Sequence, residues 1–205
     1  MAFAALNPEF MAAGFHKSGT CKWSRRCGDE LNAIWLQRHT TKASFCVNLG
    51  VHYSFMEKAG SSDLPCGDSI DEIECAIRKR LVSEPGMGDQ WWPICEESFM
   101  EVSELFRRLG IAYFGSYSLE GSIRKTPISE IEAGTAPLFL GSSTVVACVV
   151  LAEIHEHFGD RDKCVEAATL GLKHVGMKVG AKKYFKEVLK RYGATPNSES
   201  GGRAC

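Results

Sequence analysis

The chain has 205 residues, of which 44% are hydrophobic and 24% are charged, and its formal net charge is −1. This balance suits one folded domain, or one domain with an appendage, and excludes a chain that is disordered throughout. The near-neutral charge argues against binding to nucleic acid or to a membrane surface, because both draw on clustered positive charge. The longest apolar stretch, 145–152, is too short to cross a bilayer, which needs about 20 residues.

Nine cysteines are scattered along the chain, and none forms a Cys-x-x-Cys pair. Their spacings match no common zinc site, and several lie at apolar positions, where a thiol behaves as a small hydrophobic group. The first 15 residues lack the positively charged start of a signal peptide. We therefore expect reduced thiols, a cytoplasmic location, and no metal or cofactor.

The predicted elements begin with a helix that starts at Asn7-Pro8, turns Phe10 and Met11 inward and ends at Gly14. Strands are predicted over 20–27, 31–39 and 43–53, separated by short turns. Three successive strands of this kind are typical of an antiparallel meander.

The third strand has the clearest pattern, a strict alternation of apolar and other residues. One face carries Phe45, Val47, Leu49, Val51 and Tyr53, and the other carries Cys46, Asn48, Gly50 and His52. Glycine inside a strand often marks the close approach of another group, so Gly50 draws attention to the second face.

A helix is predicted from residue 68 or 69, because Ile70, Ile73, Ile77 and Leu81 have the spacing of one helical face. Acidic residues at its start and basic residues at its end would suit the helix dipole. A second helix is predicted after Trp92, with Gly110 as its stop.

From residue 126 onward the pattern is helical, with a predicted pair over 144–158 and 160–175 and a last helix ending near residue 192. The pair resembles one unit of a tetratricopeptide array, but an array needs at least three units, so we interpret it as a helical hairpin. Segregated strands and helices favour an α+β fold with a small, mainly antiparallel sheet flanked by helices. The predicted organisation is a sheet domain over 1–125, a helical subdomain packed on it over 126–192, and a disordered tail over 193–205.

Several segments of the first half resemble the bacterial family called domain of unknown function 4304. They are GFHKSG at 14–19, LQR at 36–38, FCVNLGV at 45–51, CAIRKRL at 75–81 and the tryptophan pair at 91–92. The resemblance runs from about residue 3 to about residue 109. It implies a compact helix-plus-sheet domain, and it implies no reaction.

The second face of the third strand is the predicted binding site. If the second and third strands pair, Gln37 would lie near Asn48, and His52 projects to the same face. Arg78 or Arg80, together with Trp91 or Trp92, would close over that surface. Such groups suit recognition of a ligand or partner, although they would equally well satisfy one another or face solvent.

No catalytic motif is present. The run His155-Glu156-His157 is unsuited to metal binding, because residues two apart on a helix point to different sides.

Two hypotheses for the function remain. The first is a protein-interaction module of the immunity or accessory type that binds a single bacterial protein partner, with Trp91 and Trp92 as exposed aromatic candidates. The alternative is a small-molecule-binding protein or an enzyme of unknown reaction that uses the polar strand face.

Overall fold

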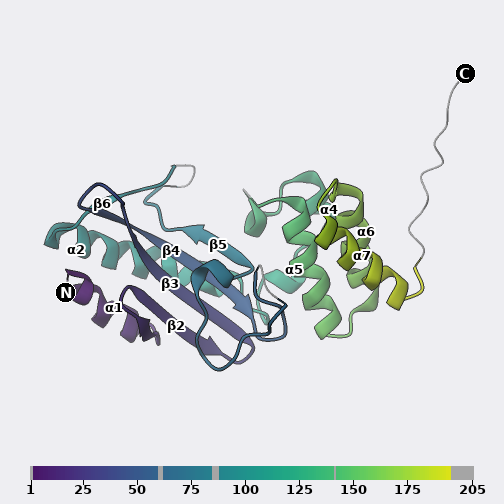
Figure 1. The fold of residues 1–205 in the computed structure, drawn as a ribbon, viewed down its shortest axis with the longest axis horizontal. Coiled ribbons are helices and arrows are strands. Elements are labelled where there is room, and N and C mark those ends of the chain that lie inside the picture. Colours follow the sequence, from purple (N-terminus) through teal and green to yellow (C-terminus); the bar gives the residue numbers. More distant parts are fainter. Residues whose placement is uncertain (1, 60–61, 85–87, 141, 195–205) are drawn as a thin grey trace, which may run out of the picture. The chain divides into compact units, whose positions relative to one another are not determined.

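The computed structural model describes residues 2–59, 62–84, 88–140 and 142–194 (Figure 1). Contacts between Cα atoms divide the chain into two compact units, Met1–Gly121 and Ser122–Cys205, which we call the sheet unit and the helical unit. The predicted α+β class is confirmed. Most of the predicted tail, from residue 195 on, lies outside the described residues.

The sheet unit is built around one antiparallel sheet, which has six strands among the described residues. The strands are β1 (His16–Gly19), β2 (Lys22–Cys27), β3 (Glu30–Arg38), β4 (Ser44–Tyr53), β5 (Ile77–Arg80) and β6 (Trp92–Pro93). Their order is β1-β2-β3-β4-β5, and β6 also pairs with β4. The predicted meander is confirmed as β2, β3 and β4, and β1, β5 and β6 extend the sheet beyond it.

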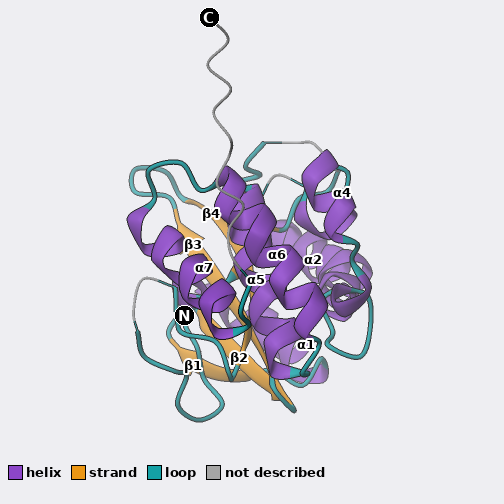
Figure 2. Ribbon diagram, turned by 90° about the vertical axis from the view of Figure 1, so that its right-hand side faces the viewer, coloured by secondary structure: helices purple, strands orange, loops and turns teal. Residues whose placement is uncertain are grey.

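Helices cover one face of this sheet, with α1 and α2 on the same side of the strands (Figure 2). The 3-10 turn η1 (Ala2–Leu6) leads into α1 (Asn7–Ala12). Later in the chain, α2 (Glu96–Leu105) continues through the π turn η3 (Phe106–Gly110) into α3 (Ile111–Ser116). The predicted stop at Gly110 was therefore wrong. A Cβ atom on Gly110 would come within 2.4 Å of the Phe106 ring, so this glycine makes room for the ring inside the helix.

The core of the unit lies between these helices and the first face of β4. All five alternating side chains of that face are buried, as the pattern predicted. Phe10 packs edge-on against Trp23 and against Phe106, with ring centroids 4.9 Å apart in each case. Met11, which was also expected to face inward, is 64% exposed. Neighbouring residues lie about 100° apart around an α-helix, so Met11 points away from the side on which Phe10 is buried.

The helix predicted from residue 68 was wrong. Only the 3-10 turn η2 (Glu72–Glu74) forms there, after a capping box at Asp71, and the chain is already extended at Cys75. It then enters β5, whose pairing with β4 is continued by a bond from the Leu81 amide to the Val47 carbonyl oxygen, 2.9 Å. Pairing with the free side of β4 outweighed the local helical spacing, because it satisfies backbone groups of a central strand.

The helical unit follows its predicted order. It contains η4 (Ile123–Lys125), α4 (Ile128–Ala133), η5 (Pro137–Phe139), α5 (Thr144–His157), α6 (Arg161–His174) and α7 (Val179–Arg191). The α5–α6 hairpin turns at Gly159, whose φ of +71° lies in the left-handed region that favours glycine. Among the described residues, no helix is both long and apolar enough to cross a membrane.

Candidate functional site

Three neighbouring strands bring polar side chains together on the second face of the sheet. Asn48 of β4 lies opposite Trp35 of β3 on one side and opposite Arg80 of β5 on the other. Gln37 is two residues beyond Trp35 and therefore shares its face. We call Gln37, Asn48, Arg80 and their contacts Asp89 and Trp91 the Arg80 cluster.

The members of the cluster bind one another. The Arg80 Nε donates to Asn48 Oδ1 at 3.2 Å, and Arg80 Nη2 donates to Gln37 Oε1 at 3.3 Å. The Asn48 amide nitrogen donates to the same Gln37 oxygen at 3.4 Å. Arg80 Nη1 forms an ion pair with Asp89 Oδ2 at 2.5 Å, and the guanidinium carbon lies 5.3 Å from the Trp91 ring centroid. The guanidinium group thus contacts Asn48, Gln37 and Asp89 through its nitrogen atoms, and it also lies close to the Trp91 ring.

Burial differs across the cluster. Asn48 is only 6% exposed, whereas the Arg80, Gln37 and Trp91 side chains are half-buried. The neighbouring Cys46 thiol, 3.7 Å from Gln37 Oε1, is also covered. Burial raises the pKa of Cys46 above its ordinary value, and the positive charge of Arg80 only partly offsets this. Cys46 is therefore a protonated thiol at neutral pH and not an activated nucleophile.

His52 shares the strand face but lies outside the cluster. It is fully buried, its Nε2 lies 3.1 Å from the Met56 carbonyl oxygen, and the Ala76 amide donates to its Nδ1 at 3.2 Å. Because Nδ1 accepts a bond, the proton is on Nε2 and the ring is neutral. Burial lowers the pKa of His52, which agrees with that form. Its ring joins the two ends of the connection between β4 and β5.

Trp91 and Trp92, both predicted as candidates for the polar face, lie on opposite faces of the sheet. Trp91 packs edge-on against His39, with centroids 4.8 Å apart, and lies beside Arg80. Trp92 is 2% exposed and packs near Phe45 on the helix-covered face, where its Nε1 donates to Glu101 Oε1 at 2.9 Å. Successive residues of an extended chain point to opposite sides, so one of the two had to leave the polar face. Trp92 is not an exposed aromatic residue.

Glu72 is the polar residue that the sequence reasoning missed. It belongs to η2, which lies on the polar face directly over Gly50: a Cβ atom on Gly50 would come within 2.6 Å of Cys75 Sγ and 3.4 Å of Glu72 Cα. Glu72 is 8% exposed. Burial raises the pKa of its carboxyl, and the charges of Arg78, Arg80 and Lys22 oppose that shift. Gly50 within the strand was the available signal of a close approach. The helix expected from residue 68 hid the fact that η2 is the segment that approaches it.

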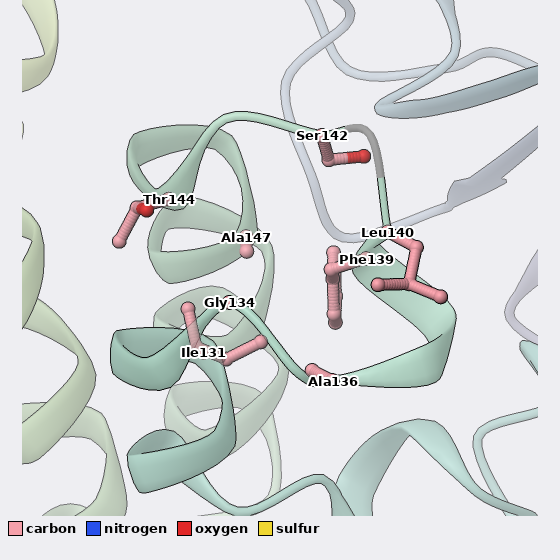
Figure 3. A pocket seen from close by; sticks show the side chains of 8 residues that line it. All are labelled: Ile131, Gly134, Ala136, Phe139, Leu140, Ser142, Thr144 and Ala147. Atoms are coloured by element: carbon pink, nitrogen blue, oxygen red, sulfur yellow. The ribbon is translucent and has the colours of Figure 1, made fainter.

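A small hollow lies in the helical unit, between α4 and the start of α5 (Figure 3). Its lining consists of Ile131, Gly134, Ala136, Phe139, Leu140, Ser142, Thr144 and Ala147. The cavity volume is about 80 Å³, whereas pockets for small ligands usually measure about 300–1,000 Å³. It contains no titratable side chain and offers no chemistry. No group of His, Cys, Asp and Glu side chains suited to a metal occurs within the described ranges.

The fold and the site define an α+β sheet domain whose polar face carries a mutually bonded cluster. The model of the family described as "Domain of unknown function (DUF4304)" matches residues 6–107, so the chain carries a domain of this family over that segment. The predicted resemblance is confirmed, and all of the predicted site residues fall within the matched segment. Comparisons with curated proteins and with solved structures gave no match.

Proposed function

We propose that this protein is a protein-interaction module of the accessory or immunity type, which binds one protein partner in a bacterial cytoplasm through its sheet unit. The observation that carries the proposal is the outer side of β5. This strand ends the sheet, and among the described residues no strand pairs with its other side. An unpaired strand edge is a ready template for a second chain.

The Arg80 cluster supports this proposal rather than a ligand site. Arg80 donates through Nε to Asn48 and through Nη2 to Gln37. Its buried Nη1 is paired in charge with Asp89 but has no hydrogen-bond partner among the described residues. The two hydrogen bonds tie β5 to β4 and β3, so they hold the outer strand in a fixed position. A fixed edge loses less conformational freedom when a partner binds to it.

The test is affinity capture with the full chain from cells that express it natively, followed by reconstitution from the two purified proteins. We expect a stoichiometric partner that co-elutes with the chain in size-exclusion chromatography. The matched control is Lys182→Glu, an exposed change on α7 of the helical unit, which should leave the complex intact. Capture that yields no stoichiometric partner would contradict the proposal.

Binding of a small molecule is a second candidate, and the observation that favours it is the nearly buried Glu72 carboxyl among Arg78, Arg80 and Lys22. A thermal-shift screen with small carboxylates and amides tests it. A compound that stabilises the wild type but not Glu72→Gln would support this function. Compounds that stabilise both proteins equally, or neither, would count against it.

A further inference from the structure

We propose that the partner presents an acidic, extended segment that adds to the outer side of β5 as a further strand. The inference rests on the proposed function and names the chemistry of the partner. It is carried by two features of β5, the direction of its backbone groups and the charge of its side chains.

The backbone direction follows from the pairing register. Arg80 lies opposite Asn48, Lys79 opposite Leu49 and Arg78 opposite Gly50, and the Leu81 amide donates to the Val47 carbonyl oxygen. Bonded and non-bonded pairs alternate along an antiparallel ladder. Lys79 therefore bonds to β4, whereas the N–H and C=O groups of Arg78 and Arg80 point away from it. This outer side offers alternating donors and acceptors.

The side chains make this edge positive. Arg78 and Lys79 are exposed, and neither forms an ion pair with another residue in the described part of the chain. The charge of Arg80 is already paired with Asp89. Because successive side chains point to opposite faces, Arg78 lies on the polar face and Lys79 on the helix-covered face. An added strand with two adjacent acidic residues would place one carboxylate beside each cation.

The backbone pattern favours a peptide over a nucleic acid as the occupant. Phosphate oxygens only accept hydrogen bonds, so the phosphates of a nucleic acid cannot donate to the outward carbonyl groups of Arg78 and Arg80; the donors of RNA lie on its ribose hydroxyls and bases. A peptide strand supplies both donors and acceptors at the right spacing. Basic residues on an outer strand also discourage aggregation. If Arg78 and Lys79 serve only that purpose, the edge would bind neither a peptide nor an RNA strand.

The test is a titration of the ¹⁵N-labelled full chain, followed by amide NMR. The probe is a synthetic ten-residue peptide of valine and threonine with two adjacent glutamates at its centre. We expect the amide signals of Arg78 and Arg80 to shift and to exchange more slowly with solvent. A matched peptide with lysines in place of the glutamates should bind at least about tenfold more weakly, because two favourable charge pairs become repulsive.

Two variants locate the binding site. Arg78→Pro removes an outward N–H without breaking a bond to β4, so the chain should fold but lose the peptide response. Arg78→Thr keeps the N–H and removes the charge, so binding should weaken by about threefold. Lys182→Glu is the control and should respond as the wild type does. A common melting temperature for the variants and the wild type would establish that they are folded.

The inference is overturned if the acidic peptide leaves the Arg78 and Arg80 signals unchanged, or if Arg78→Pro binds it as the wild type does. It is also overturned if a ten-nucleotide uridine oligomer, and not the peptide, shifts these signals. A captured protein partner that binds Arg78→Pro with unchanged affinity would refute the strand addition and leave the interaction function standing. If no partner is captured but the peptide response is normal, the interaction function is refuted and strand addition at β5 stands.

Discussion

The two ends of the polar face of β4 provide hydrogen-bond partners for their polar side chains in different ways. At the Asn48 end, polar side chains bond mainly to other side chains and remain partly open to solvent. At the His52 end, one fully buried ring bonds to the backbone at Met56 and Ala76. Gly50 separates the two ends and allows η2 to lie on the sheet.

The comparison teaches that a shared strand face does not imply a shared site. An imidazole bonded to the backbone holds a connection in place, because the groups that it satisfies have no water available. A half-buried side-chain cluster contributes less to stability, because solvent competes for each of its bonds. The two ends should therefore respond differently to substitution. All four tryptophans lie in the sheet unit, so tryptophan fluorescence can follow the unfolding of this unit in urea.

The largest effect is expected at the buried end. His52→Ala leaves the Met56 carbonyl and the Ala76 amide without their partner and opens a cavity, so unfolding in urea should become easier by about 2–4 kcal/mol. His39→Ala is the control, because that ring is half-exposed and should cost less than about 1 kcal/mol. Equal costs at the two histidines would mean that the His52 bonds do not matter.

Gly50→Ala should have the next largest effect. The added Cβ would lie 2.6 Å from Cys75 Sγ and 3.0 Å from Cys75 Cβ, so η2 must move away from the sheet. We expect a loss of about 1–3 kcal/mol in the same fluorescence measurement. Adding Cys75→Ala should recover part of it. Gly19→Ala is the matched control, because a Cβ there meets its nearest neighbour at 3.5 Å, an ordinary contact.

A smaller effect is expected from pH at the buried end. The pKa of His52 is lowered in the folded state, so its contribution to stability is complete above the unfolded pKa of about 6.5 and is lost as pH falls towards the folded pKa. Stability should fall on acidification by at most about 1.4 kcal/mol per pH unit for this group. His52→Gln, which keeps a donor for the Met56 carbonyl, should flatten the dependence. An unchanged slope in this variant would assign the pH effect to other groups.

The sequence predicted the part of this region that depends on alternation alone. The period of two placed Asn48 and His52 on one face, and the short turn before β4 placed Gln37 near Asn48. Gly50 was correctly interpreted as the point of close approach. These features follow from local geometry, which any strand with this pattern must obey.

The remainder depended on long-range pairing that no local pattern reports. The spacing of Ile70, Ile73 and Ile77 is helical, and only the free side of β4 turned residues 77–80 into a strand. That error hid the position of Glu72 and the edge that Arg78 forms. The separation of Trp91 from Trp92 had the same origin, because no local pattern indicates that residues 92 and 93 pair with β4.

The smallest effects are expected at the Arg80 end, and they separate its two kinds of contact. Arg80→Met removes the bonds to Asn48 and Gln37 but keeps an apolar stem beside Trp91, so we expect a loss of about 1 kcal/mol. Asp89→Asn removes only the charge of an exposed partner and should cost about 0.5 kcal/mol or less. The Asp89 effect should vanish in 1 M salt, whereas the Arg80 effect should persist, because salt screens an exposed ion pair far more than a half-buried hydrogen bond. If both losses vanished in salt, the cluster would be a surface charge pair and would not hold β5 against β4.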